Sequence, residues 1–136
     1  MTALIDLSAP TVAVLGDATQ VTGLSRRLPP AWRVLHTPDV EYVRPGELAL
    51  LISPGPAEVA RIRRRLPAGC ALAVLVDRAA SAATIADVLQ AGAEVCVRAG
   101  STTVLAGHLV ACHRRRTRPA AAQVSPGETV RTVRAG

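Results

Sequence analysis

A chain of 136 residues is long enough for one domain with a buried core, and 49% of its residues are apolar. With no Phe, one Trp and one Tyr, that core must be packed from Ala, Val, Leu and Ile. All sixteen basic residues are Arg, so every mechanism that needs a lysine ammonium is excluded, including Schiff-base chemistry and a P-loop.

The net charge of +6 is concentrated near the end of the sequence. Residues 1–113 hold ten Arg and nine acidic residues, whereas residues 114–136 hold six Arg and one acidic residue. The three cysteines are widely spaced and form no Cys-x-x-Cys pair, which indicates free thiols in a reducing compartment. No basic, apolar leader opens the sequence and no apolar run is long enough for a membrane span, so we expect a cytoplasmic protein.

Short apolar runs alternate with segments of helical periodicity in the first half of the chain. The run Thr11–Leu15 predicts a strand, and the helix after it ends at the paired Pro29 and Pro30. A segment with two prolines and a glycine, 38–47, has room for only a short helix. The buried face of this first helix is predicted to be Val21, Leu24 and Leu28. The second and third predicted strands are Trp32–Thr37 and Leu48–Ser53.

The second half of the chain continues this alternation. Ala71–Val76 predicts a fully buried fourth strand and Glu94–Arg98 a short fifth strand. Ser81 and Ser101 are the expected N-caps of the last two helices. The helix faces predicted to be buried are Val59, Ile62 and Leu66, then Ile85, Val88 and Leu89, then Val104, Leu105, Leu109 and Cys112.

Five apolar strands joined by helical crossovers predict an α/β domain with a doubly wound parallel sheet and helices on both faces. The commonest order for five such strands is 2-1-3-4-5, the flavodoxin-like order. The apolar periodicity stops at Thr117. We therefore expect an N-terminal extension at 1–9, a domain at 10–116 and a basic, disordered tail at 117–136.

The segment Leu89–Glu94 has the sequence LQAGAE, which resembles the L-x-A-G-A-[DE] turn between helix 4 and strand 5 of bacterial response-regulator receiver domains. The resemblance covers residues 10–116 in organisation and is specific over 85–116. It implies a receiver-like fold and a role in bacterial signal transduction, in a two-component system or in transcription regulation. Gly92 is expected to take a left-handed conformation in this turn.

The residues that a working receiver uses for phosphotransfer are not retained. Such a receiver has an acidic pair after strand 1, an aspartate after strand 3, a hydroxyl residue after strand 4 and a lysine after strand 5. The aspartate attacks phosphorus, and Mg²⁺ held by the acidic residues bridges it to the phosphoryl oxygens. The corresponding positions here are Gly16 and Asp17, Ile52 or Ser53, Val76 or Asp77, and Arg98 or Ala99.

Only Asp17 keeps the expected chemistry, and one carboxylate does not make a Mg²⁺ site. The sequence therefore predicts a degenerate pseudo-receiver with no catalytic residue, no metal and no cofactor. Polar residues at the strand ends suggest either a remodelled pocket or the remains of a pocket closed by an ion pair of Arg98. The polar residues in question are Asp17, Ser53, Asp77 and Arg98, with Asp17 or Asp77 as the partner of Arg98.

Three other patterns suggest different chemistry. The loop Gly16–Gly23 precedes a helix and suggests a nucleotide site, although it is neither G-x-G-x-x-G nor a P-loop. His108 and Cys112 have a helical spacing suited to a metal, but no third or fourth ligand is evident. The candidate contacts to nucleic acid or an acidic partner, which lack interleaved aromatic residues, are Arg114, Arg115, Arg116 and Arg118.

We therefore predict a phosphorylation-independent, receiver-like regulatory domain that is not an enzyme and acts by protein–protein interaction. The resemblance implies that a partner protein or a second copy binds the face formed by helix 4, strand 5 and the last helix. Two alternatives stay open. One is a small-molecule- or nucleotide-binding flavodoxin-like module, and the other is a nucleic-acid-associated transcriptional regulator that uses its Arg-rich tail. No membrane association is expected.

Overall fold

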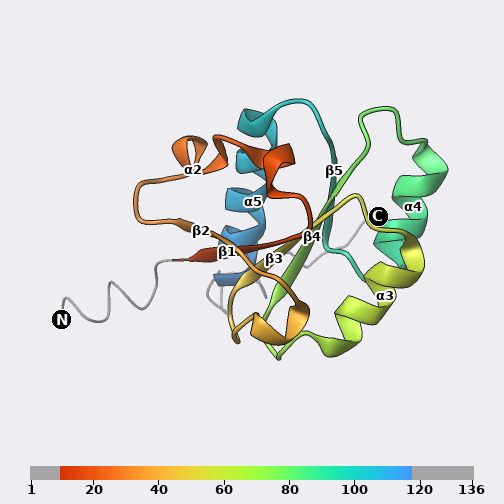
Figure 1. The fold of residues 1–136 in the computed structure, drawn as a ribbon, viewed down its shortest axis with the longest axis horizontal. Helices are drawn as coiled ribbons and strands as arrows, with labels where there is room; N and C mark the ends of the chain where they lie inside the picture. The colour runs from red at the N-terminus through yellow and green to blue at the C-terminus, as the bar shows by residue number, and fades with distance from the viewer. Residues whose placement is uncertain (1–9, 118–136) are drawn as a thin grey trace, which may run out of the picture.

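Five parallel strands form one sheet in the order β2-β1-β3-β4-β5, which confirms the predicted topology (Figure 1). The computed structural model describes residues 10–117. The predicted N-terminal extension and the predicted tail from residue 118 onward lie outside the described residues. Thr117, which we assigned to the tail, is the last residue of the final helix. The strands are β1 Thr11–Leu15, β2 Arg33–His36, β3 Leu48–Ile52, β4 Ala71–Val76 and β5 Val95–Arg98.

The strands form where the sequence has continuous apolar runs, because a parallel sheet with covered faces buries both sides of each strand. Every residue of β4 is buried, as are the first four residues of β3. The edge strand β2 differs, since three of its four residues are exposed. The observed strand limits differ from the predicted ones by one residue at each end of β2, at the end of β3 and at the start of β5.

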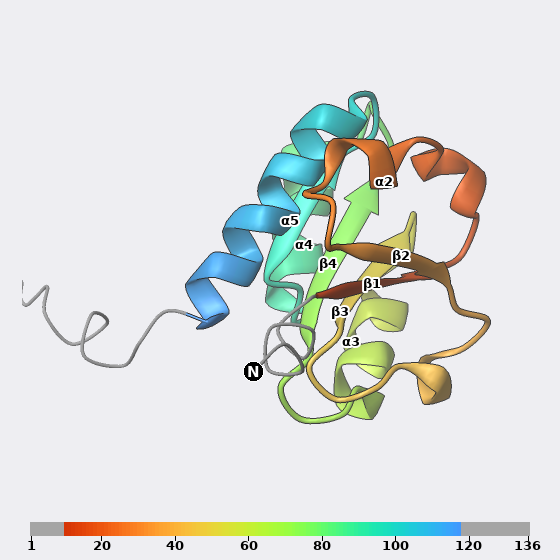
Figure 2. The same cartoon turned by 90° about the vertical axis from the view of Figure 1, so that its left-hand side faces the viewer.

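Helices cover both faces of the sheet (Figures 1 and 2). On one face, α2 and α5 pack over alternate strand residues such as Leu50 and Ala73. On the other face, η2, α3 and α4 pack over the intervening residues such as Leu51 and Val74. The helical elements are η1 Ala18–Val21, α2 Leu24–Arg27, η2 Val40–Tyr42, α3 Pro56–Arg65, α4 Ala82–Gln90 and α5 Thr102–Thr117.

The crossover between β1 and β2 contains much less helix than the sequence pattern predicted. Val21, Leu24 and Leu28 are buried as predicted, but Val21 lies in η1 and Leu24 in α2, which have four residues each, and Leu28 is the extended C-cap of α2. Gly23 lies between the two pieces with a φ of 86°. A left-handed residue cannot continue a right-handed helix, so the helix is interrupted there.

Both predicted serine N-caps are confirmed. The Ser81 hydroxyl accepts a hydrogen bond from the Thr84 amide at 3.1 Å, and the Ser101 hydroxyl accepts one from the Val104 amide at 3.1 Å. These bonds satisfy amides in the first turn that have no partner within the helix. The starts of α4 and α5 are therefore set by local sequence.

Two of the predicted inward-facing residues point outward. Leu89 is 43% exposed and Val104 is 52% exposed. Each residue follows or precedes a fully buried neighbour, Val88 or Leu105, and successive helical residues are separated by about 100°. The sheet is in contact with a narrower stripe of each helix than the prediction assumed.

Candidate functional site

The positions that carry phosphotransfer in a receiver do gather at one edge of this sheet. The strands are parallel, so their carboxyl ends meet there. The register places Leu15 beside Leu51, Ile52 beside Leu75, and Val76 beside Arg98. The predicted phospho-pocket positions, from Gly16 and Asp17 to Arg98, end or directly follow these strands and lie at this edge.

Asp17 caps the first helical turn and has no ion-pair partner among residues 10–117. Its Oδ1 accepts hydrogen bonds from the Thr19 amide at 3.0 Å and from the Thr19 hydroxyl at 2.5 Å. These two bonds to Thr19 favour the ionised form and lower the pKa of the exposed Asp17 carboxyl. The acidic side chain that survives from the receiver pattern is thus held by its own loop.

The end of β3 presents a hydrocarbon instead of a carboxylate. Ile52 is partly buried and packs against the core on the α2 and α5 face. A Cβ at Gly16 would lie 3.1 Å from the Ile52 Cβ, so the two strand ends are in close contact. Ser53 follows with a φ of 52°, and its amide donates to the Leu75 carbonyl at 2.7 Å.

At the ends of β4 and β5, polar side chains are also hydrogen-bonded to the backbone of nearby loops. Val76 is buried, and Asp77 Oδ1 accepts a hydrogen bond from the Ala79 amide at 2.7 Å. Arg98 Nε donates to the Ala80 carbonyl oxygen at 3.0 Å. Within the described range, neither Asp17 nor Asp77 forms a salt bridge with Arg98, so the predicted ion pair is absent. Each polar group is satisfied by nearby backbone, which removes the need for that pair.

Two cavities lie at this edge of the sheet. The cavity between η1 and the β5–α5 loop, lined by Gln20 and by Gly100–Thr102 among others, has a volume of about 50 Å³. A second cavity of about 230 Å³ lies beside β1 and β3 and is lined by Gly16, Asp39 and Arg61, among others. From the loop Gly16–Gly23, only Gly16 and Gln20 line either cavity.

The His108 and Cys112 pair has no further ligand nearby. No group of three or more His, Cys, Asp or Glu side chains comes together within residues 10–117 in a way that could hold a metal ion. His108 is exposed, while Cys112 is buried and its Sγ lies 4.0 Å from Glu94 Oε1. Burial raises the pKa of the Cys112 thiol, and the nearby Glu94 carboxylate raises it further.

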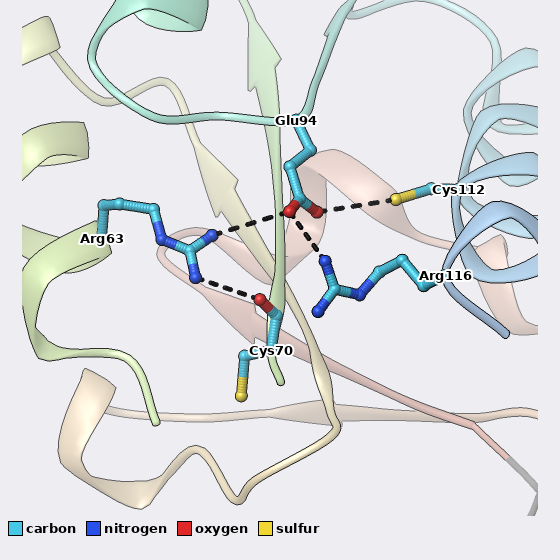
Figure 3. Close-up of polar contacts among 5 residues, drawn as sticks. All are labelled: Arg63, Cys70, Glu94, Cys112 and Arg116. Atoms are coloured by element: carbon cyan, nitrogen blue, oxygen red, sulfur yellow. Dashed lines mark hydrogen bonds and ion pairs between the residues drawn. The ribbon is translucent and has the colours of Figure 1, made fainter. Parts of the chain in front are cut away.

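Glu94 connects the two helical layers at the opposite, amino-terminal edge of the sheet (Figure 3). Its Oε2 lies 2.8 Å from Arg116 Nη1 on α5 and 4.0 Å from Arg63 Nη1 on α3. Arg63 Nη2 also donates to the Cys70 carbonyl oxygen at 3.1 Å. Sequence reasoning identified Glu94 only as part of the LQAGAE turn, because its partners are 22 and 31 positions away.

The ion pair with Glu94 involves only one arginine of the run at the end of α5. Arg116 is paired with Glu94, whereas Arg114 and Arg115 are exposed and form no salt bridge in the described part of the chain. Arg118 lies outside the described residues. Among the described arginines of this run, Arg114 and Arg115 are therefore the two without a carboxylate partner.

The predicted interaction face of α4, β5 and α5 carries two exposed apolar side chains, Leu89 on α4 and Val104 on α5. Two small residues of this region do not extend the exposed face. Ala93 is buried, and Gly107 lines a groove between α5 and α2. Cys96 is partly buried on β5, and burial raises the pKa of its thiol.

The sequence matches no known protein-family description and no curated protein. Two solved structures share its fold. A response regulator from Thermotoga maritima superposes with a TM-score of 0.62 at 17% identity, over 76% of this chain and 96% of that one. A putative pilus assembly protein (cpaE) from Burkholderia thailandensis superposes with a TM-score of 0.54 at 16% identity, over 82% and 99%.

These similarities show the receiver-domain fold. They agree with the resemblance at Leu89–Glu94 and with the observed strand order. Within residues 10–117, none of the helices has the length and apolar character that crossing a bilayer requires.

Proposed function

We propose that this chain is a receiver-type regulatory domain of a bacterial cytoplasmic pathway that acts through protein–protein contact, without accepting a phosphoryl group and without catalysing a reaction. The observation that carries the proposal is Ile52. A partly buried hydrocarbon ends β3, where a receiver holds the aspartate that is phosphorylated.

The surroundings of Ile52 support the proposal. Transfer of a phosphoryl group to a carboxylate needs a nucleophile, a Mg²⁺ site and cations on the remaining oxygens. Asp17 is bonded to Thr19, Asp77 to the Ala79 amide, and Arg98 to the Ala80 carbonyl. The sequence has no Lys.

A binding experiment with a phosphoryl mimic tests this proposal. The full chain is melted with and without Mg²⁺ and beryllium fluoride, beside a phosphorylatable receiver as the positive control. We expect the control to melt at a higher temperature with the mimic and this chain to be unchanged. A Mg²⁺-dependent rise that Asp17→Asn removes would contradict the proposal.

The contact surface in this proposal is the face of α4, β5 and α5. Leu89 near the end of α4 and Val104 near the start of α5 are the large apolar side chains that these helices expose, and exposed apolar area can mark an interaction site. Light scattering over a concentration series separates a second copy from another protein as the partner. Self-association that Leu89→Arg or Val104→Arg removes, and that Ala57→Arg on α3 retains, would place a second copy on this face.

A small-molecule site is the second candidate function, and one observation favours it. The cavity of about 230 Å³ lies where the strand order reverses between β1 and β3, the usual ligand position in doubly wound folds. Thermal melts with a panel of nucleotides test it. Under the main proposal no nucleotide raises the melting temperature, and a saturable rise that Arg61→Ala abolishes would favour the second candidate.

A further inference from the structure

The short crossover between β1 and β2 leaves part of α5 without a helical neighbour. The helix α5 has sixteen residues, whereas η1 and α2 have four each (Figure 2). A groove with a volume of about 470 Å³ lies between the end of α2 and the outer side of α5. We call it the α2–α5 groove.

The groove follows α5 for three helical turns. Its lining extends from Thr103 to Arg114, and at 1.5 Å per residue this corresponds to about 16 Å. Between an arginine at each end, the lining residues are small or apolar. Leu28 from the α2 side and Ala106 from α5 are buried at its floor, and Val110 is partly buried. A Cβ added at Gly107 would meet no atom within 4 Å, so the space above this glycine is open.

The walls of the groove are basic. Arg27 stands at the end of α2 and Arg114 stands on α5, and both are exposed. No Asp or Glu lines the groove, and neither arginine forms a salt bridge among residues 10–117. An apolar floor between two unpaired cations is complementary to an apolar stripe flanked by carboxylates.

We propose that the α2–α5 groove binds an acidic amphipathic helix of a partner protein. A helix of three turns matches the length of the groove, and its apolar stripe would cover the open surface at Gly107. Carboxylates beside that stripe would pair with Arg27 and Arg114. This surface is separate from the face of α4, β5 and α5, and the inference stands whether or not the chain accepts a phosphoryl group.

Three other occupants fit the groove less well. A second copy placed symmetrically on the groove would bring Arg27 and Arg114 against the same cations. The residues after α5 carry three Arg and one Glu, so they would also meet like charge. Nucleic acid would be attracted to the arginines, but it gains little from an apolar floor without aromatic rings for stacking.

Two pairs of variants separate binding from folding. Gly107→Leu fills the groove, and its control Gly107→Ala adds only a methyl group in open space. Both replace a helical glycine and are expected to raise the melting temperature, so lost binding cannot come from unfolding. Arg27→Glu combined with Arg114→Glu reverses the charge of both walls. Its control is Arg64→Glu, an exposed position on α3 at the other face of the sheet.

The probe is a displayed library of helical peptides of about fourteen residues, with leucines fixed along one face and Glu, Gln or Lys at the other positions. Selection on the full chain is expected to enrich acidic sequences. A synthetic peptide from that pool should shift NMR signals of α2 and α5. Its affinity should fall about tenfold or more with Gly107→Leu and with the charge reversal, and be unchanged in both controls.

Several outcomes would overturn the inference. They are enrichment of basic or neutral peptides, failure to enrich any peptide, equal binding to Gly107→Leu, and NMR shifts confined to other faces. A dimer in solution that Gly107→Leu dissociates would show a second copy in the groove instead. Duplex DNA that competes with the peptide and shifts the same signals would show nucleic acid there.

Discussion

Glu94 is exposed over about a third of its side chain, yet it contacts groups from both helical layers. Arg116 on α5 lies 2.8 Å away and Arg63 on α3 lies 4.0 Å away. An isolated pair at this exposure stabilises a protein by only a few tenths of a kcal/mol, and shared contacts add to it. The contribution of Glu94 should therefore be modest but measurable.

We predict that Glu94→Gln lowers the free energy of unfolding by about 1 kcal/mol, measured by urea titration at low salt. The loss should shrink as salt is added, because salt screens the contacts that remain partly exposed. Glu58→Gln is the matched control, since its pair with Arg61 is 3.8 Å long and half exposed on one helix. An equal loss in both variants would show that Glu94 does not connect the layers.

His113 packs edge-on against Trp32, with 5.2 Å between the ring centroids. Burial lowers the pKa of His113 below its usual value of 6.5, because the charged form is poorly solvated there. The unfolded chain therefore binds a proton at a higher pH than the folded chain. The stability that His113 contributes is complete above pH 6.5 and is lost as the pH falls toward the folded-state pKa.

We predict that the free energy of unfolding decreases between about pH 7 and pH 5, and that His113→Gln reduces this decrease. Urea titrations at several pH values, followed by Trp32 emission, measure both. A pH dependence identical in the two proteins would assign the effect to other groups.

Gly92 shows how one residue of the LQAGAE turn determines packing. Its φ is 127°, and a Cβ there would lie 2.7 Å from Arg63 Cγ. We predict that Gly92→Ala destabilises the domain by about 1–2 kcal/mol, through backbone strain and displacement of Arg63. Gly107→Ala is the control of opposite sign and should stabilise α5 by about 1 kcal/mol. Thermal melts compare the two, and stabilisation by Gly92→Ala would refute the assigned geometry.

At the scale of elements, the last helix depends on a cap that the sequence specifies. The Ser101 hydroxyl accepts a hydrogen bond from the Val104 amide, and α5 carries buried residues such as Leu105 and Leu109. We predict that Ser101→Ala lowers stability by about 1 kcal/mol in urea titration. Ser101→Asp, which keeps a capping oxygen and adds charge at a helix N-terminus, should restore it. A Ser101→Asp protein as unstable as Ser101→Ala would contradict the capping role.

The sequence allowed the strands to be predicted within a residue because buried parallel strands are continuous apolar runs bounded by Gly and Pro. The first helix was predicted too long, since periodicity alone does not reveal that Gly23 adopts a left-handed conformation. The groove beside α5 follows from that interruption and could not be predicted.

For the candidate site too, some features could be predicted from the sequence and others could not. The carboxyl ends of parallel strands lie at the same edge of the sheet, so the positions of Asp17, Ile52 and Arg98 followed from the topology. Their partners did not, because loop conformation decides whether Arg98 meets a carboxylate or the Ala80 carbonyl. The contact of Glu94 with Arg116 joins distant segments and leaves no periodic signal in the sequence.

At the scale of the whole molecule, the two edges of the sheet have different properties. The carboxyl edge has a hydrocarbon at Ile52, where a receiver has its aspartate. Asp17 is bonded within its own loop, and Arg98 is bonded to Ala80 in the neighbouring β4–α4 loop. At the amino edge, the Glu94 carboxylate contacts an arginine of α3 and an arginine of α5.

The absence of phosphotransfer is the central claim, and the intact mass of the full chain after incubation with acetyl phosphate and Mg²⁺ tests it most directly. A working receiver treated in parallel confirms that the reagent is active. The account predicts that the mass of this chain stays unchanged while the control gains one phosphoryl group. A single phosphoryl adduct on this chain, lost in Asp17→Asn or Asp77→Asn, would contradict it.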